Sequence, residues 1–432
     1  MKRVQGQSWL LLAGLFALNA ACAAEPARVL TLEAALATVE STHPDLLLAQ
    51  AERDSALAER DMAASRTDTS VNLEGILRSG SQPSWTQDFT SDNSVRLTAR
   101  KTLYDFGRSG AAEDAARLEL NAREADLITT RDRRRMEIMA RYFDVLLADL
   151  QYTADNELMA VHYVGFDQGK DRLERGQISS VELADLESRY QDTLLRRNTS
   201  AQRQRITRAM LANAMNRPGD LASDLQDPPL AGNQRALPDY ETLIPLLLEN
   251  NSRLRAQQEM LAASQKRLES LRAENGPTLD AEVQAADYSR RAVTRDNLSA
   301  GLILSWPLYQ GERSNSRVAR EQAQFYKLQA GSEKLKMELT QALLETYMEV
   351  SQLQGAARNA ARVNSDYRDM LLERSRGLYE LELKSNLGTS MVETAEANLR
   401  SRRNEYQLAL GLARLDALLG NPNWDNLKES KK

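Results

Sequence analysis

Two pairs of carboxylates are the residues of this sequence best placed to do chemistry. Glu182 and Asp185 lie in the segment SSVELAD, and Glu393 and Glu396 lie in the similar segment SMVETAE. Residues three apart share one face of a helix, so each pair can present two negative charges together. Carboxylates gathered in this way favour cations and raise one another's pKa.

The same segments allow a purely structural interpretation. Ser179 with Glu182, and Ser390 with Glu393, both have the spacing of a capping box, in which the serine and the glutamate satisfy the free amides at the start of a helix. The second acid of each pair has no capping role. Both interpretations remain open at this point.

Nothing else in the sequence points to catalysis. The only two histidines, His43 and His162, are far apart, and we expect both to be ordinary helix residues. One cysteine gives no zinc cluster and no disulfide. The tripeptide GKD at 169–171 lacks the upstream glycine and the following Ser or Thr of a phosphate-binding loop. We therefore predict no enzyme, no cofactor and no metal site.

The acidic segments belong to a long internal repeat. LYDFGRS at 103–109 returns as WPLYQGERS at 306–314, a spacing of 205 residues between Tyr104 and Tyr309. A period this long indicates two duplicated halves and not a solenoid. The predicted division is a signal peptide 1–23, a first repeat 24–217, a linker 218–239, a second repeat 240–420 and a tail 421–432.

Each half has the same predicted order of elements. A helix is followed by a β-hairpin, a long helix, a turn and a returning helix. The predicted ranges are helices 31–66 and 240–275, hairpins 71–104 and 279–309, long helices 108–172 and 312–384, turns near Gly176 and Gly388, and returning helices to about 217 and 420. Few glycines and prolines and mixed charges fit a mostly α chain with a small β part.

Each of the four predicted strands has one apolar and one polar face. Each strand also has about the length that crosses an outer membrane. Lipid does not tolerate open sheet edges, because each unpaired backbone group costs several kcal/mol there. Four strands cannot close around a water-filled bore. Identical copies must therefore complete the barrel, and three copies give twelve strands.

Aromatic residues flank the predicted strands where membrane–water boundaries would lie. Tyr104, Phe106, Trp306 and Tyr309 would mark the inner boundary. Trp85, Phe89 and Tyr288 would mark the outer one.

The N-terminus has the form of a secretion signal. Lys2 and Arg3 precede an apolar core at 9–18, and Ala21, Cys22 and Ala23 form a small-residue cleavage site. Cys22 could alternatively carry a lipid. With a mean hydropathy of −0.53 and a net charge of −5, the chain is neither a helical membrane protein nor a candidate for nucleic-acid binding.

The signal peptide, the duplicated unit and the two Leu-Tyr corners resemble the TolC family of outer-membrane efflux ducts. The resemblance implies a homotrimer whose twelve-stranded barrel crosses the outer membrane and continues into a periplasmic α-helical coiled-coil barrel. It also implies an equatorial region built from 218–239 and the segment after Gly420. The family usually has proline before Leu-Tyr; Pro307 keeps it, and Thr102 replaces it.

The resemblance also implies partners and places the candidate residues. Glu393 and Glu396, and then Glu182 and Asp185, would form acidic rings at the periplasmic entrance. Gly176, Gly388 and Thr389 would shape helix tips that a periplasmic adaptor grips, and an inner-membrane pump of the ABC or RND type would supply energy. Arg175 or Arg189 could link neighbouring helices in the closed state.

Two classes of function remain open at this point. The first is a passive duct for efflux or type I secretion, with drugs, metal ions or proteins as cargo. The alternative is a periplasmic structural coiled-coil or adaptor protein without a pore.

Overall fold

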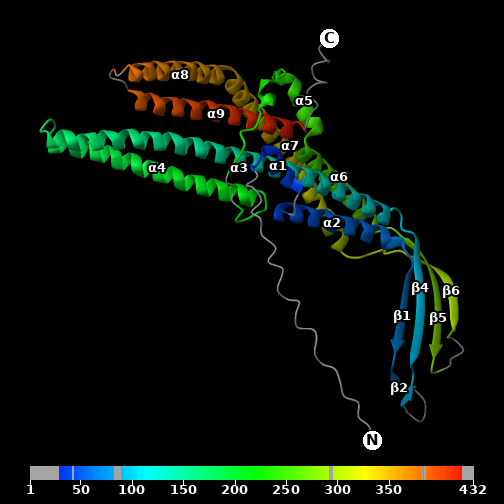
Figure 1. Ribbon diagram of the computed structural model, residues 1–432. Coiled ribbons are helices and arrows are strands. Elements are labelled where there is room, and N and C mark those ends of the chain that lie inside the picture. The colour runs from blue at the N-terminus through cyan, green and yellow to red at the C-terminus, as the bar shows by residue number, and fades with distance from the viewer. Residues whose placement is uncertain are drawn as a thin grey trace, which may run out of the picture.

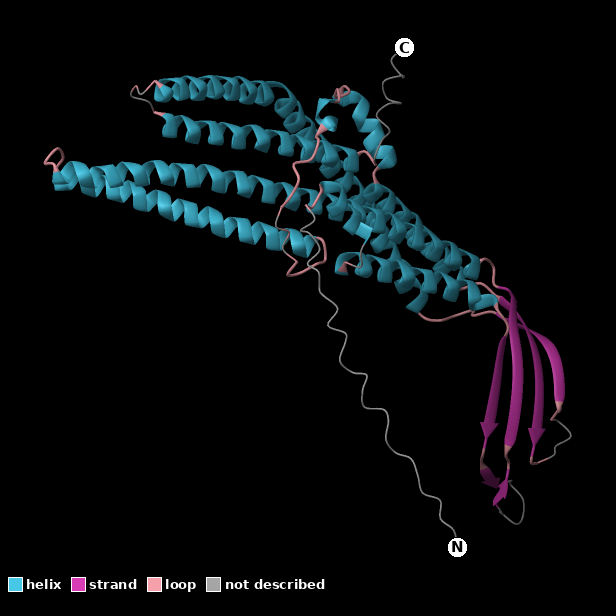
Figure 2. Cartoon of the chain, in the orientation of Figure 1, coloured by secondary structure: helices cyan, strands magenta, loops and turns pink. Residues whose placement is uncertain are grey.

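The computed structural model describes residues 29–40, 43–81, 89–220, 222, 224–290, 295–381, 383 and 386–420. The chain is long, with its strands at one end and most of its helices at the other (Figure 2). The predicted signal peptide, Cys22, Trp85 and the C-terminal tail lie outside the described residues.

One antiparallel sheet unites the two predicted hairpins. Its order is β1-β4-β5-β6, so a β4–β5 pairing joins the first repeat to the second. The bounds are Ser70–Ile76 for β1, Ser94–Tyr104 for β4, Thr278–Tyr288 for β5 and Leu298–Ser305 for β6. Two short strands, β2 (Ser79–Ser81) and β3 (Phe89–Ser91), extend the first hairpin beyond this sheet.

A β-bulge at the end of β4 alters the predicted alternation. The register shifts between Thr102 and Tyr104, so Tyr104 lies opposite Leu279. Strict alternation from Val95 places Leu103 on the apolar face; the bulge brings Tyr104 to that face instead, because an extra residue reverses the alternation. Thr102, which stands where the family usually has proline, donates a 2.7 Å hydrogen bond to Asp280.

The corner after β4 turns the chain sharply into α3 (Arg108–Glu174). Phe106 and Gly107 both have positive φ, 55° and 82°, a backbone conformation that favours glycine. The Asp105 carboxylate accepts a 2.8 Å hydrogen bond from the Ser109 amide and so satisfies one free donor of the helix start. The corner therefore converts a strand into a single helix of 67 residues.

Each first helix predicted from the sequence is divided in two. The 31–66 helix is observed as α1 (Leu32–Ala37), the 3₁₀ turn η1 (Thr38–Glu40), α2 (Pro44–Ala64) and the 3₁₀ turn η2 (Ser65–Thr67). The 240–275 helix is observed as α5 (Tyr240–Asn250) and α6 (Ser252–Ala273), because extended Asn251 interrupts it and caps α6. Next to the sheet, the helices contact one another in the order α2-α3-α6-α7, where α7 is Arg313–Gln352.

Two helical hairpins extend away from the sheet (Figure 1). The first pairs the far half of α3 with α4 (Ser180–Ala214), and the second pairs α8 (Arg358–Glu380) with α9 (Leu387–Leu418). The predicted continuous helix 312–384 is interrupted by a π-helical segment, Leu353–Ala357, where one extra residue per turn redirects the chain. In this part of the chain the helices contact one another in the order α4-α3-α9-α8.

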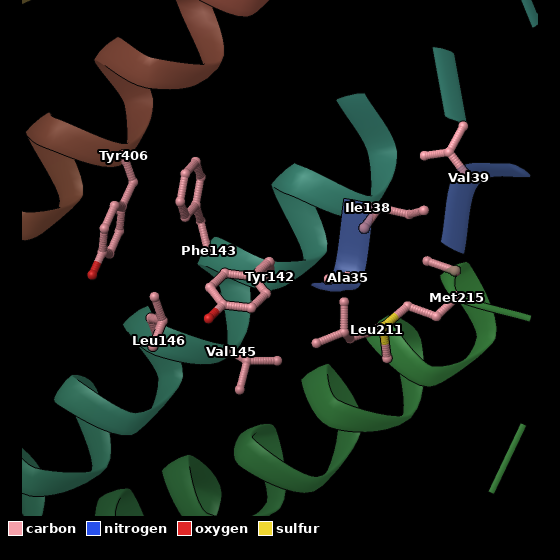
Figure 3. Packing of buried hydrophobic residues seen from close by; sticks show 11 residues of the cluster. Ala35, Val39, Ile138, Tyr142, Phe143, Val145, Leu146, Leu211, Met215 and Tyr406 are labelled. Atoms are coloured by element: carbon pink, nitrogen blue, oxygen red, sulfur yellow. The ribbon is translucent and has the colours of Figure 1, made fainter. Parts of the chain in front are cut away.

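The main hydrophobic core lies where the two halves meet (Figure 3). Phe143 of α3 stacks on Tyr406 of α9 with a ring separation of 4.6 Å, and Tyr142 is fully buried beside them. The segment predicted as a linker crosses this level: Leu225 forms a parallel bridge with Leu30, and the 3₁₀ turn η3 (Ala231–Gln234) places Asn233 against Glu405. This level connects the sheet-proximal helices to the two hairpins.

Candidate functional site: the helix tips and the sheet boundary

The first acidic pair lies at the start of α4. Gly176, with a φ of 70°, makes the turn between α3 and α4. Ser179 and Glu182 then form the capping box that the sequence allowed, with the Ser179 amide 2.7 Å from the glutamate. Hydrogen bonds from the Ser179 amide and hydroxyl lower the pKa of Glu182. Asp185 is exposed and pairs with Arg189 at 2.9 Å on the same helix.

The capping-box interpretation of the second pair is wrong. Helix α9 begins at Leu387 with Asn386 as its N-cap, so Ser390 and Glu393 lie inside the helix. Ser390 is buried, and its hydroxyl is 2.8 Å from that of Ser375 on α8. Glu393 therefore does not cap the helix, and it forms an ion pair with Arg368 of α8.

Glu396 faces the other hairpin. Its carboxylate is 3.7 Å from Arg196 of α4, and the same guanidinium is 2.6 Å from Asp155 of α3. Asp155 is only 3% exposed. Arg196, Asp155 and Arg368 are functional residues that were not predicted. The available sequence signal was the spacing of Asp155, seven residues after Ala148, which places a carboxylate on the same face of the long helix as an apolar residue.

The two arginines expected to link neighbouring helices act locally within this chain. Arg189 pairs with Asp185 one turn away, and Arg175 is the C-cap of α3. Arg196 is the residue that connects α4 to α9.

The two hairpin tips end at different levels. Gly388, which we expected in a turn, lies in the first turn of α9, and a Cβ there would come within 2.8 Å of Val161 on α3. Thr389 beside it is exposed. From Val161, α3 continues to Glu174, or roughly 20 Å at ~1.5 Å per residue. The first hairpin therefore projects beyond the second, as Figure 1 shows, and the acidic pairs lie at two levels.

The predicted boundary aromatics gather at the helix end of the sheet. Tyr104 and Phe106 contact edge to face at 4.7 Å. Tyr104, Phe106, Trp306 and Tyr309 are all more than half exposed, Tyr309 at 90%. At the opposite end Phe89 is exposed and Arg295 stacks over Tyr288.

The remaining polar candidates do not converge on a reaction centre within the described residues. We expected His43 inside a helix. It lies immediately before α2 instead, where it is the N-cap. His162 lies on α3. No group of three His, Cys, Asp or Glu side chains in the described ranges could hold a metal ion. Across the same ranges, every helix is too short or too polar to span a bilayer.

Comparisons with known proteins agree with this architecture. Residues 243–421 match the family model described as outer membrane efflux protein. No curated protein sequence matches the chain. Among solved structures, the CusC channel aligns with a TM-score of 0.74 and 15% identity over 90% of this chain and 92% of its own.

Two further solved structures are similar. VceC from Vibrio cholerae has a TM-score of 0.71 and 15% identity, with 90% of this chain and 96% of that chain covered. The MtrE channel of Neisseria gonorrhoeae has a TM-score of 0.68 and 16% identity, with coverages of 90% and 88%. The fold is therefore that of outer-membrane channels.

Proposed function

We propose, from the match of residues 243–421 to the outer membrane efflux protein family model, that this chain is the outer-membrane exit duct of an export system. Three copies would form a passive channel from the periplasm to the exterior. An inner-membrane transporter of the ABC or RND type and a periplasmic adaptor would complete the system. The observation that carries the proposal is that three parts of the described chain, which we call layers, have edges without a partner. These layers are the sheet, the helices next to the sheet and the two helical hairpins.

The sheet is the first of these layers. In the described part of the chain, β1 pairs only with β4, and β6 pairs only with β5. Each outer strand thus offers a free row of backbone donors and acceptors. Within lipid such edges must be paired, and β6 of one copy with β1 of the next would do so.

The helices next to the sheet form the second layer. The outer helices, α2 and α7, expose apolar side chains that nothing in the described chain covers. They are Leu47, Leu48 and Met62 on α2, and Tyr326, Met337, Leu344 and Met348 on α7. An exposed apolar stripe of this length indicates a further helix packed against it.

The two helical hairpins form the third layer. Here α4 exposes Val181 and Leu195, and α8, which has no fully buried residue, exposes Val363, Tyr367 and Met370. In every layer one edge comes from the first repeat and the other from the second. Edges that differ in this way join head to tail and close into a ring.

The two faces of the sheet support the same assembly. The apolar face exposes Leu73 at 72% and Leu302 at 67%, without a cover. The polar face carries two cross-strand ion pairs among its charges: Arg100 Nε lies 2.9 Å from Glu282, and Arg96 lies 3.6 Å from Glu74. Lipid outside and water inside a barrel match these two faces. A coiled-coil protein without a pore gives the apolar face no partner.

We further propose that the two acidic pairs surround the periplasmic entrance and that an adaptor contacts the projecting tips around Gly176, Gly388 and Thr389. The division into a removable segment 1–23, repeats 24–217 and 240–420, an equatorial segment 218–239 and a tail 421–432 belongs to the same proposal. The duplicated order of elements and the position of 218–239 at the central core support it.

The edge surfaces provide a direct test. We expect the wild-type protein to fractionate with the outer membrane and to run in detergent as a trimer that heat dissociates. Val363→Glu with Met370→Glu on α8 should shift it to monomer, because two charges would be buried at the interface. Val363→Ile with Met370→Leu is the matched control and should stay trimeric. A wild-type protein that is monomeric and soluble without detergent would refute the proposal.

A further inference from the structure

One lysine lies on the face of the sheet that the proposed assembly turns toward lipid. Lys101 of β4 is paired with Ala281, and Ala99 and Leu97 share its side of the strand. Ala281 is in turn paired with Leu302 of β6. Lys101 thus belongs to the same face as the most exposed leucines of the sheet.

Lys101 is the one basic residue on that face of the described strands β1, β4, β5 and β6. Its side chain is exposed, and no described carboxylate forms an ion pair with it. The other charged residue of this face, Asp287, is paired with Val95 near the opposite end of the sheet. Among the residues that the structure describes, the lysine therefore has no counter-ion.

A neighbouring copy does not provide a counter-ion through strand pairing either. β4 is an inner strand, with β1 on one side and β5 on the other. Within the described four-stranded sheet, only β1 and β6 have free edges for another subunit. The partner of Lys101 must approach from the open face of the sheet, which in the assembly is the membrane.

The position of Lys101 along β4 determines which part of a lipid molecule it would contact. Tyr104, three residues further along β4, begins the aromatic boundary at the helix end of the sheet. Lysine near such a boundary extends its stem along apolar surface until the ammonium reaches the headgroups. The small side chain of Ala281, opposite Lys101, leaves room for that stem. The ammonium then lies at the level of lipid phosphates, beside the Tyr104 ring.

We propose that Lys101 and Tyr104 form a binding site for the phosphate of an anionic phospholipid in the inner leaflet of the outer membrane, one site per subunit. This inference rests on the proposed barrel. The lysine supplies the charge, and the amphipathic tyrosine ring covers the lipid glycerol region. The site would hold the barrel at a fixed depth in the bilayer, because its headgroup contact cannot move toward the hydrocarbon.

Native mass spectrometry of the purified trimer with added phosphatidylglycerol tests the site. We expect up to three lipids per wild-type trimer and about fivefold weaker retention for Lys101→Gln, the loss expected from one lysine near a lipid surface. Lys101→Arg should retain the lipid. Lys327→Gln, which removes an exposed lysine from α7, is the matched control and should behave as wild type.

The readouts separate this inference from the proposed function. If Lys101→Gln remains a conducting trimer and keeps phosphatidylglycerol as tightly as wild type, the lipid site is wrong and the duct stands. Equal retention of phosphatidylglycerol and phosphatidylcholine by the wild-type trimer would also overturn it. If the wild-type protein forms no trimer, the proposed barrel is wrong, and the lipid site that depends on it is wrong as well.

Discussion

Arg196 of α4 lies between two carboxylates from different helical hairpins, with Asp155 at 2.6 Å and Glu396 at 3.7 Å. Asp155 is buried and also accepts a 3.0 Å hydrogen bond from Gln151. Glu396 is partly exposed, and its longer contact is weaker. The first pair therefore fixes Arg196 within its own hairpin, and the second forms a weak, breakable link to α9.

Removing that weak link should loosen the two hairpins. We predict that Glu396→Gln raises the open probability of the channel, and so its mean conductance in planar bilayers, because α9 is no longer held to α4. An exposed pair contributes at most about 1 kcal/mol, so the open fraction should rise by no more than about fivefold. Asp185→Asn, which breaks only the local pair with Arg189, is the control. An unchanged conductance in Glu396→Gln would show that the link does not hold the tips.

The acidic pairs should differ in how they affect cations. We predict that Glu393→Ala with Glu396→Ala weakens block of the channel by multivalent cations, since two negative charges per subunit leave the entrance. The corresponding change, Glu182→Ala with Asp185→Ala, acts at the projecting first hairpin, where the entrance should be wider, and should have a smaller effect. Current–voltage recordings with added trivalent cation measure both. Equal block in wild type and the first variant contradicts an entrance ring.

The features repeated along the sequence were predictable from it. Period-two alternation located β5 and β6, and the two Leu-Tyr corners located the starts of the long helices. These patterns depend on residues close in sequence. The amphipathic faces also indicated that the sheet needs partners outside one chain.

The features that were missed depend on contacts between distant residues. The bulge between Thr102 and Tyr104 lies where β4 pairs with β5 of the other repeat, next to the hydrogen bond from Thr102 to Asp280. The unequal tips follow from the packing of Gly388 on Val161, and the partner of Glu396 comes from α4. Glu393 matched a capping box in sequence, but the start of α9 at Leu387 gave it a different role.

The N-cap of α2 should make the start of that helix sensitive to acid. His43 Nδ1 accepts a 3.2 Å hydrogen bond from the Asp45 amide, which requires an unprotonated nitrogen. Burial, and then Arg134, lower the pKa of His43 against opposing effects of Asp45 and Glu137. The unfolded segment therefore binds a proton first as pH falls below about 6.5, and the cap loses stability from there downward.

His43→Asn should remove this pH dependence and keep the helix, because asparagine caps without titrating in this range. Hydrogen exchange of the Leu46 and Leu47 amides, corrected for intrinsic rates, measures the effect. Protection in wild type should fall between pH 7.5 and 5.5, and in His43→Asn it should stay constant. A parallel decline in both proteins would assign the acid sensitivity to another group.

Tyr142 should hold the first described residues to the central core. Its hydroxyl proton is shared between the carbonyls of Gln226, at 2.5 Å, and Leu30, at 2.8 Å. Burial raises the pKa of Tyr142 to about 12. Tyr142→Phe leaves the partly buried carbonyls of Leu30 and Gln226 without this donor, which costs about 1 kcal/mol.

We therefore predict that Tyr142→Phe lowers the hydrogen-exchange protection of the Leu30 and Gln226 amides by about fivefold, since these amides bond across the same bridge. Tyr326→Phe on α7 removes an exposed hydroxyl and should leave them unchanged. The pKa shift adds a second readout. Unfolded tyrosine ionises near pH 10 and the folded one only near 12, so wild type should lose protection as pH rises through this range and Tyr142→Phe should not. The same alkaline loss in both proteins would mean that the hydroxyl does not secure the bridge between Leu30 and Leu225.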